Sequence, residues 1–216
     1  MKTKDRIINC ALQLFNQSGE RNITTNHIAA HLEISPGNLY YHFHNKEEII
    51  HSIFDQYALD LKVRFPAIGE SEQKSIMPTF HIMQNYLDSI FMLMWNYRFL
   101  YSNLPNILSR DKALQQKYLK AQQELHDNLV SIMFSFRDTG LVNLEDEEVV
   151  ALTKTLHLVS TCWISYQTTM SIDTVITEKD IYRGMLQMLN VVKPIATVDG
   201  KKQFVALEQY YLEQCR

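Results

Sequence analysis

Apolar residues recur every three or four positions from the start of this chain, the spacing that places them on one face of an α-helix. Over residues 3–17 this spacing puts Ile8, Leu12 and Phe15 on one face, and a Ser-Gly pair then ends the run. A second run begins at Thr25, whose side chain can cap the first turn of a helix. The pattern therefore predicts two amphipathic helices near the N-terminus.

Two more helix starts follow closely. Ser35 and Pro36 are a capping residue followed by a proline at the first helical position, which predicts a short helix over residues 36–42. Asn45 caps a fourth helix, and Glu48 stands where its side chain can return a bond to the cap residue. The first part of the chain is thus predicted to hold four helices, two of them short.

The rest of the chain is predicted to form longer helices, after a connection over residues 67–75. The stretch over residues 80–101 is apolar nearly all round, which favours a helix enclosed by other helices. Asp88 and Arg98 interrupt it, which argues against a membrane span. A capping box opens one of the later helices. The helices expected here cover residues 78–101, 104–108, 111–136, 146–170, 178–192 and 202–213.

The composition agrees with an all-α protein. Only 6 glycines and 5 prolines occur among 216 residues, and 46% hydrophobic beside 21% charged residues is ordinary for a globular protein with a real core. Cys10, Cys162 and Cys215 lie far apart and match neither a zinc pattern nor a disulfide framework. No apolar signal segment precedes the first helix, so the expected location is the cytoplasm, with no membrane partner.

The sequence does not predict an enzyme. No nucleophile beside a base, no glycine-rich phosphate loop and no pair of acids on one face is evident. His27 and His31 are four residues apart, as metal ligands can be, but no third ligand is evident and the outer face of such a helix needs polar residues anyway. We therefore expect neither a cofactor nor a metal.

The second and third predicted helices, joined by a tight turn with the first packed behind them, form a helix-turn-helix unit. In such units the second helix of the pair enters the major groove of DNA, and its N-terminal residues reach the base edges. Residues 1–46 carry a net charge of +2 and the remainder −5. This asymmetry is small but has the sign that contact with DNA requires.

The residues around the start of this helix suit DNA contact. Gly37 allows the backbone to approach closely, and Asn38 offers a donor and an acceptor side by side, which suits adenine. Lys46 and the free N–H groups at the start of the fourth helix can bind a phosphate. The candidate contacts are Thr25, Pro36, Gly37, Asn38, Tyr40, Tyr41, His42 and Lys46.

Residues 5–52 closely resemble the N-terminal signature of the tetracycline-repressor (TetR) family. The resemblance implies that Thr25, Ser35, Gly37, Tyr40, His42 and Lys46 contact DNA, mostly its backbone, and that positions 36, 38 and 41 set operator preference. Pro36 departs from the polar or basic residue common at its position in the family. The residues that carry the resemblance are Thr24, Thr25, Ile28, Ala29, Leu32, Ile34, Ser35, Gly37, Leu39, Tyr40, His42, Phe43, Asn45, Lys46 and Glu47.

The helices over residues 146–170 and 178–192 carry apolar stripes that suit pairing with another helix. In the TetR family the last two long helices pair with their copies in a four-helix dimer interface, and this pattern agrees. The alternative is that both stripes pack only within one chain. The residues expected at the interface are Leu152, Leu156, Val159, Trp163, Ile181, Met185, Met188 and Val192.

Aromatic, methionine and a few polar residues lie on helices that would surround the ligand cavity of a TetR-like protein. Such a lining suits a lipophilic or flat ligand. For each residue taken alone, ordinary core packing is the alternative. The candidates are Tyr86, Phe91, Met94, Trp95, Tyr97, Tyr118, Trp163 and Gln167.

The sequence therefore predicts a DNA-binding domain over residues 1–48 and a ligand-binding and dimerisation domain over 49–216, linked by a helix over about 45–65. We expect a homodimer that represses transcription at a partly palindromic double-stranded operator and is released by a small-molecule effector. The alternative is a DNA-binding protein without a ligand, acting as an architectural or protein-recruiting factor.

Overall fold

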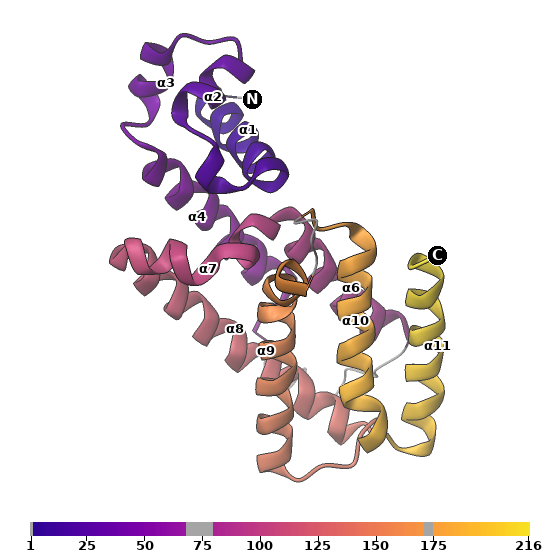
Figure 1. Cartoon of the computed structure of the whole chain (residues 1–216). Helices are drawn as coiled ribbons and strands as arrows, with labels where there is room; N and C mark the ends of the chain where they lie inside the picture. Colours follow the sequence, from indigo (N-terminus) through magenta and orange to yellow (C-terminus); the bar gives the residue numbers. More distant parts are fainter. Residues whose placement is uncertain (1, 68–79, 171–174) are drawn as a thin grey trace.

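The computed structural model describes residues 2–67, 80–170 and 175–216, and the regular structure within these ranges is helical. A small N-terminal domain stands on one end of a larger helical bundle, and helix α4 runs from one into the other (Figure 1). The β pairing in the described part is limited to one isolated bridge between Val142 and Ala196. The prediction of an all-α protein with these two parts is confirmed.

Apolar side chains from the N-terminal helices meet in one core, where Ile7, Ile28 and Leu39 are fully buried. This core continues along α4 through Ile53 into the larger bundle. The boundary expected between residues 48 and 49 falls inside α4. The elements are α1 (Thr3–Ser18), the 3-10 turn η1 (Glu20–Asn22), α2 (Thr25–His31), α3 (Pro36–His42) and α4 (Lys46–Arg64).

The cap of α2 lies one residue earlier than expected. The hydroxyl of Thr24 accepts the backbone N–H of His27 at 3.3 Å, and the His27 ring accepts the N–H of Thr24 at the same distance. Thr25 is the first residue inside the helix. The side chain of His27 thus completes a capping box in place of the usual Glu or Gln.

In the larger bundle α9, α10 and α11 lie side by side, and α6 and α8 pack against them (Figure 1). No helix of the described residues is both long enough and apolar enough to cross a membrane. The elements are α6 (Phe80–Asn96), α7 (Arg98–Arg110), α8 (Lys112–Asp138), α9 (Asp146–Met170), α10 (Glu178–Val192), the 3-10 turn η2 (Lys193–Ile195) and α11 (Val198–Gln214).

Three helix bounds differ from the sequence prediction by four residues or more. The helix expected up to residue 101 ends at Asn96, and α7 then runs through Pro105 with a kink at Asn103. Because proline lacks an N–H and its ring crowds the preceding turn, a kink there is expected. Helix α11 begins four residues early, because the hydroxyl of Thr197 caps it by accepting the N–H of Gly200 at 3.0 Å. The residues before Phe80 in the predicted helix, and most of the expected connection, lie outside the described residues.

Asn16 on α1 holds the break between α6 and α7. Its side-chain amide donates to the carbonyl of Asn96 at 2.7 Å, and its side-chain oxygen accepts the N–H of Phe99 at 3.1 Å. These are backbone groups that a helix end leaves without a partner. The ring of Phe15 lies beside that of Phe99, with 5.2 Å between their centroids. The N-terminal domain is therefore fixed to the bundle by both polar and apolar contacts.

Candidate nucleic-acid interface and ligand cavity

Helix α3 presents its first turn and one flank to solvent. The hydroxyl of Ser35 accepts the N–H of Asn38 at 3.2 Å, and this cap fixes where the helix begins. Pro36, Gly37 and Asn38 are exposed at the tip, while Leu39 is fully buried and anchors the helix to the core. The tip is therefore rigid and accessible, as a reading element for DNA needs to be.

Two tyrosines follow the tip. Tyr41 is 83% exposed and Tyr40 45% exposed, large values for aromatic side chains. The hydroxyl of Tyr40 lies 3.4 Å from that of Thr25, and the ring of Tyr41 packs edge-on against His42. Thr25, Tyr40, Tyr41 and His42 thus form one polar surface on α2 and α3.

The ammonium group of Lys46 does not join this polar surface on α2 and α3. It binds the carboxylate of Glu20 at 2.8 Å and the carbonyls of Glu20 and Ile23 at 2.9 and 3.2 Å. The two carbonyls use two of its N–H donors, the carboxylate adds an ion pair, and the side chain is only 20% exposed. In this structure the buried carboxylate attracts the ammonium inward, and the phosphate contact of Lys46 stays a prediction.

The start of α4 differs from the prediction in a second respect. The side chain of Asn45 caps the helix by accepting the N–H of Glu48 at 2.8 Å, as expected. The carboxylate of Glu48 then accepts the N–H of His44, not that of the cap residue, at 2.8 Å. Glu47 and Glu48 also place two acidic groups in the first turn. These acids reduce the attraction of this helix end for a phosphate.

Glu20 joins the two domains. Its side chain is 1% exposed, and besides Lys46 it binds the guanidinium of Arg110, the last residue of α7, at 3.0 Å. A carboxylate buried to this degree requires charged or hydrogen-bonding partners, which these two cations supply. The Glu20–Lys46–Arg110 network therefore connects η1, α4 and α7.

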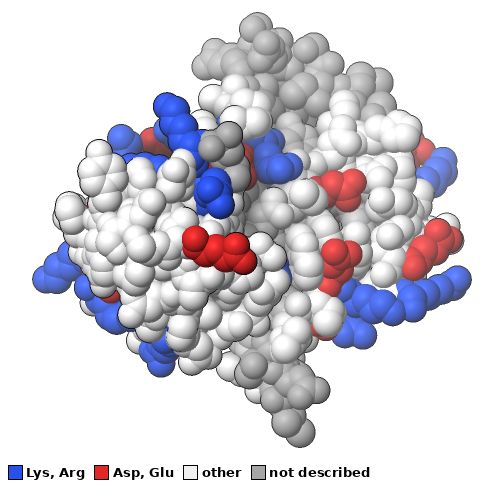
Figure 2. Space-filling view, turned by 90° about the horizontal axis from the view of Figure 1, so that it is seen from above, with Lys and Arg blue, Asp and Glu red and all other residues white. Residues whose placement is uncertain are grey.

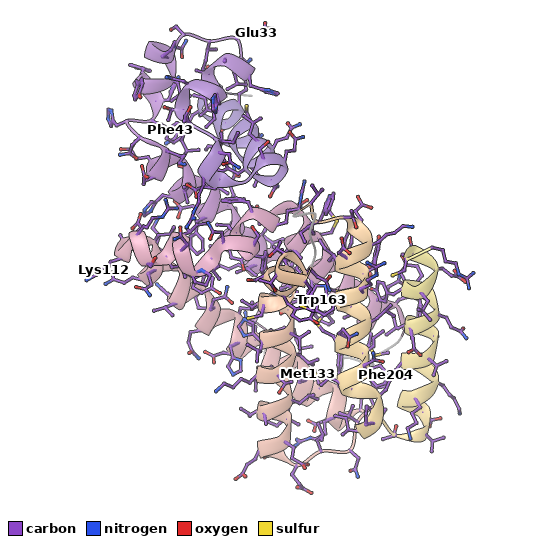
Figure 3. The ribbon with its side chains drawn as sticks, in the orientation of Figure 1. Glu33, Phe43, Lys112, Met133, Trp163 and Phe204 are labelled. Atoms are coloured by element: carbon purple, nitrogen blue, oxygen red, sulfur yellow. The ribbon has the colours of Figure 1, made fainter. Side chains whose placement is uncertain are left out.

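The DNA-facing end of the molecule is weakly charged. Figure 2 looks down on the N-terminal domain, and most of its surface from this side is uncharged, with Lys and Arg toward the margins. Glu33, in the turn between α2 and α3, lies at the far tip of the domain (Figure 3). Its backbone is left-handed, with a φ of 56°, a conformation that favours glycine. A surface of this kind would make few phosphate contacts.

An apolar cavity of about 120 Å³ lies inside the larger bundle. Its walls come from α6, α8, α9, α10 and α11, and two of its lining residues, Met133 and Phe204, are labelled in Figure 3. An engineered cavity of about 150 Å³ binds benzene, so this space suits a group of that size. A second chamber of about 30 Å³ adjoins it and shares five of its walls: Phe65, Ile90, Leu129, His157 and Ser160.

Three of these helices line the cavity with residues at positions i, i+3, i+4 and i+7, which is one helical face. On α9 the four positions include Thr153, His157 and Ser160, so polar atoms occur on an otherwise apolar wall. The full set on these helices is Met83, Tyr86, Leu87 and Ile90 on α6, Leu129, Ile132, Met133 and Phe136 on α8, and Thr153, Leu156, His157 and Ser160 on α9.

Of the eight residues predicted for the pocket, Tyr86 alone appears in the wall of the main cavity. Tyr118 lines a separate small space beside Phe54 and Tyr57. The others pack elsewhere or lie on other faces: Phe91 stacks on Tyr182, Met94 is buried in the core, Trp95 lies under Arg98, Tyr97 donates to Asp60, Trp163 packs on α10, and Gln167 is half-buried on α9.

A chain of uncharged polar groups runs from the cavity to α4. The ring Nε2 of His157 lies 2.7 Å from the side-chain oxygen of Gln122, whose amide donates to the hydroxyl of Tyr57 at 3.1 Å. Tyr57 then lies 3.2 Å from the hydroxyl of Tyr101. Because an amide oxygen only accepts, the Nε2 of His157 carries the proton.

The members of this chain are uncharged at neutral pH. Burial lowers the pKa of His157, and the nearby His126 ring adds to the effect. Burial also raises the pKa of Tyr57 and of Tyr101, so both phenols keep their protons. The chain therefore links α9, α8, α4 and α7 through neutral hydrogen bonds.

Most of the residues expected at a dimer interface lie inside the chain. Ile181 and Met185 are fully buried. Leu152, Met188 and Val192 are each at most 9% exposed. Leu156, Met188 and Val192 line the cavity. These residues are not available to a partner, because the stripes face the chain's own core. Val159 is half-buried against that core.

Trp163 packs between α9 and α10 (Figure 3). Its indole N–H donates to the carbonyl of Asp180 at 2.6 Å. A Cβ built on Gly184 would lie 2.6 Å from the ring, so only glycine leaves room for it. The sequence assigned Trp163 to both the pocket and the interface, whereas it fixes the distance between two helices.

The exposed face of α9 carries another apolar row, spaced by four residues. Leu158, Cys162, Tyr166 and Met170 lie along it, and Val150 continues it toward the start of the helix. Rows with this spacing form the ridges that pack into the grooves of a second helix. Leu158 and Cys162 were not singled out from the sequence, because burial decides which of two apolar stripes faces outward.

Comparison with known proteins supports the reading of both domains. Residues 7–53 match the model for "Bacterial regulatory proteins, tetR family", and residues 56–204 match the model for "Bacterial transcriptional repressor" of the TetR type. A TetR-family transcriptional regulator from Marinobacter aquaeolei VT8 has 36% identical residues and a TM-score of 0.83, over 98% of this chain and 99% of that one.

Two further relatives are more distant. The biofilm operon negative transcriptional regulator IcaR of Staphylococcus epidermidis is 27% identical over 152 residues, which are 69% of this chain and 77% of that protein. A transcriptional regulator from Saccharomonospora viridis, solved in complex with choline, shares the fold with a TM-score of 0.64 at 13% identity, over 90% of this chain and 97% of that one. The chain thus belongs to the TetR family of bacterial transcriptional regulators.

Proposed function

We propose that this regulator is a homodimeric repressor that binds a partly palindromic operator through α3 and is released by a small lipophilic or aromatic effector. The observation that carries the proposal is the enclosed apolar cavity, whose walls are tied through α4 to the helix-turn-helix. An apolar cavity with a few polar groups is the usual form of a ligand site.

On the DNA side, the exposed tip of α3 is proposed to meet base edges with Pro36, Gly37, Asn38 and Tyr41. Thr25, Ser35, Tyr40 and His42 are proposed to contact phosphates and so to set the register. Lys46 is left out of the direct contacts, because its ammonium group is bound to the protein itself. It holds the start of α4 against η1.

The dimer is proposed to form through the exposed row on α9, with Leu158, Cys162 and Tyr166 at its centre. The row supplies an apolar surface that a single chain leaves in solvent. A two-fold dimer would place two α3 helices on successive major grooves, about one DNA turn apart. Repression is supported by the name of IcaR as a negative regulator.

Effector release is proposed to follow from a change at α4. A ligand that fits the cavity better in one arrangement of the bundle favours that arrangement, and a coupling of about 1–3 kcal/mol changes operator affinity by roughly 5- to 150-fold. The structure of the Saccharomonospora protein with choline supports the idea that members of this fold accept small ligands.

The test is selection of binding sites from random and genomic DNA with the full chain, followed by affinity measurement. A partly palindromic site should emerge, and Asn38→Ala should weaken binding about 10-fold, since a good base contact is worth about 1–3 kcal/mol. Asn143→Ala, which changes an exposed asparagine in the bundle, is the control and should leave affinity unchanged. If no sequence is enriched, the repressor proposal fails.

A further inference from the structure

We propose that the effector is an uncharged molecule with an apolar body and one hydroxyl, and that this hydroxyl inserts between His157 and Gln122. The apolar body would fill the main cavity, and the hydroxyl would enter the adjoining chamber. This inference rests on the proposed function, because it concerns the ligand of the same cavity.

The absence of charge in the walls excludes ionic effectors. Among the described residues that line the two chambers there is no Asp, Glu, Lys or Arg, and His157 is neutral. A carboxylate, phosphate or ammonium group placed there would lose its water without gaining an opposite charge. An uncharged ligand avoids this cost.

The position of the polar atoms indicates where a ligand hydroxyl would go. The small chamber has room for about one water-sized group and is lined by Tyr57, Gln122 and His157. The Nε2–H of His157 donates and the side-chain oxygen of Gln122 accepts, 2.7 Å apart. A hydroxyl both donates and accepts, so it can bind both groups at once and leave neither without a partner. A hydrocarbon cannot.

Insertion would carry a movement to α4. Two hydrogen bonds through a hydroxyl oxygen, each about 2.8 Å long, separate the outer atoms by roughly 4.5–5 Å. Gln122 must therefore shift relative to His157, and its amide is bound to the hydroxyl of Tyr57 on α4. The first residues of helix α4 are also the last residues of the DNA-binding domain. A polar ligand thus has a route to α3 that a purely apolar ligand lacks.

Four probes of one ring size test the idea: toluene, benzyl alcohol, benzoate and benzylammonium. Binding to the full chain is measured by calorimetry, and operator affinity is measured with and without each probe. Benzyl alcohol should bind about 10-fold more tightly than toluene, one hydrogen-bonded group being worth about 1.4 kcal/mol. The two ions should not bind, and benzyl alcohol should weaken operator binding at least 5-fold.

Two variants separate the parts of the mechanism. Gln122→Leu should bring benzyl alcohol down to the affinity of toluene without changing that of toluene, whereas Gln123→Leu, at the neighbouring exposed position on α8, should change neither. Tyr57→Phe removes a single hydroxyl. It should reduce the effect of benzyl alcohol on operator binding, because Gln122 then has no hydroxyl on α4 to bind.

The inference is overturned if neither neutral probe binds or if toluene binds as tightly as benzyl alcohol. It is equally overturned if benzoate or benzylammonium binds more tightly than benzyl alcohol. It is also overturned if Gln122→Leu leaves the preference for the alcohol intact. Operator binding by the same preparations is measured independently of the probes. If selective operator binding persists, the repressor proposal stands and only this ligand assignment fails; if it is absent, the repressor proposal itself fails.

Discussion

Two polar networks each include a residue of α4. One contains Lys46, at the start of the helix, and the other contains Tyr57, about halfway along it. Near its start the Glu20–Lys46–Arg110 network is charged, and its central carboxylate is almost completely enclosed. Farther along, the network of His157, Gln122, Tyr57 and Tyr101 is uncharged and borders a cavity. The same helix is thus held by two kinds of bond.

The difference between them indicates different roles. A buried carboxylate that loses a cationic partner is costly, so the charged network favours one fixed arrangement of η1, α4 and α7. Neutral hydrogen bonds are individually worth about 1 kcal/mol and can be exchanged for bonds to a ligand. The charged network therefore fixes the DNA-binding domain, and the uncharged network is where a small change in the bundle could reach it.

The largest effect is expected from Lys46→Met. It leaves the Glu20 carboxylate buried with one cation fewer, and it should lower the free energy of unfolding by about 3 kcal/mol. Urea denaturation measures this. Lys62→Met is the control, since Lys62 pairs with Glu124 on the surface and should contribute less than about 1 kcal/mol. Equal losses for the two variants would contradict the role given to Lys46.

A smaller loss is expected from Gln122→Leu, which removes the two bonds that Gln122 makes in the uncharged network. The N–H of His157 and the hydroxyl of Tyr57 lose partners, at a cost of about 1–2 kcal/mol. The same urea experiment checks it, with Gln123→Leu as the control. A loss as large as that for Lys46→Met would remove the distinction between the two networks.

Arg110→Gln removes the ion pair by which the charged network reaches α7 and leaves the pair between Glu20 and Lys46. Arg110 is about half exposed, and Glu20 keeps Lys46 as a partner, so the loss should be about 1 kcal/mol or less. Arg183→Gln, which breaks an exposed pair within α10, gives the comparison for a surface ion pair. If the Arg110 variant loses as much stability as Lys46→Met, the link to α7 dominates the network.

The smallest expected effect is a dependence of the chain's stability on pH. Because the folded-state pKa of His157 lies below its ordinary value of 6.5, the unfolded chain takes up protons first as the pH falls through that value. The contribution of neutral His157 to the free energy of unfolding should be complete above about pH 7 and should decline below pH 6.5. The melting temperature of wild type and His157→Gln between pH 7.5 and 5.5 tests this, and identical profiles would exclude His157 as a source.

The N-terminal domain could be predicted almost residue by residue, because its signals are local. The cap of α3 uses Ser35 and an N–H three residues away, and the exposed tip follows directly. The residue there whose surroundings the sequence did not indicate is Lys46, whose partner Glu20 lies 26 residues earlier and looks like a surface charge in the sequence. Only the tertiary fold brings the two together.

The cavity could not be predicted in the same way. The sequence correctly located α8, α9 and α10, but each has apolar residues on more than one face. Which face turns inward depends on the packing of five helices, so Met188 and Val192 were assigned to a dimer interface and His157 was not among the pocket candidates. A polar residue within an i, i+3, i+4, i+7 stripe, as His157 is on α9, was the available signal.

The amide of Asn16 has a consequence for attempts to build hybrid regulators. Exchange of helix-turn-helix segments between relatives treats them as interchangeable modules, but here that amide binds main-chain groups on both sides of the α6–α7 break. A transplanted segment that brings another residue to this position would leave two partly buried backbone groups of the recipient without these partners. Hybrids that retain Asn16 should therefore inherit the recipient's response to its inducer, and those that lose it should bind DNA without that response.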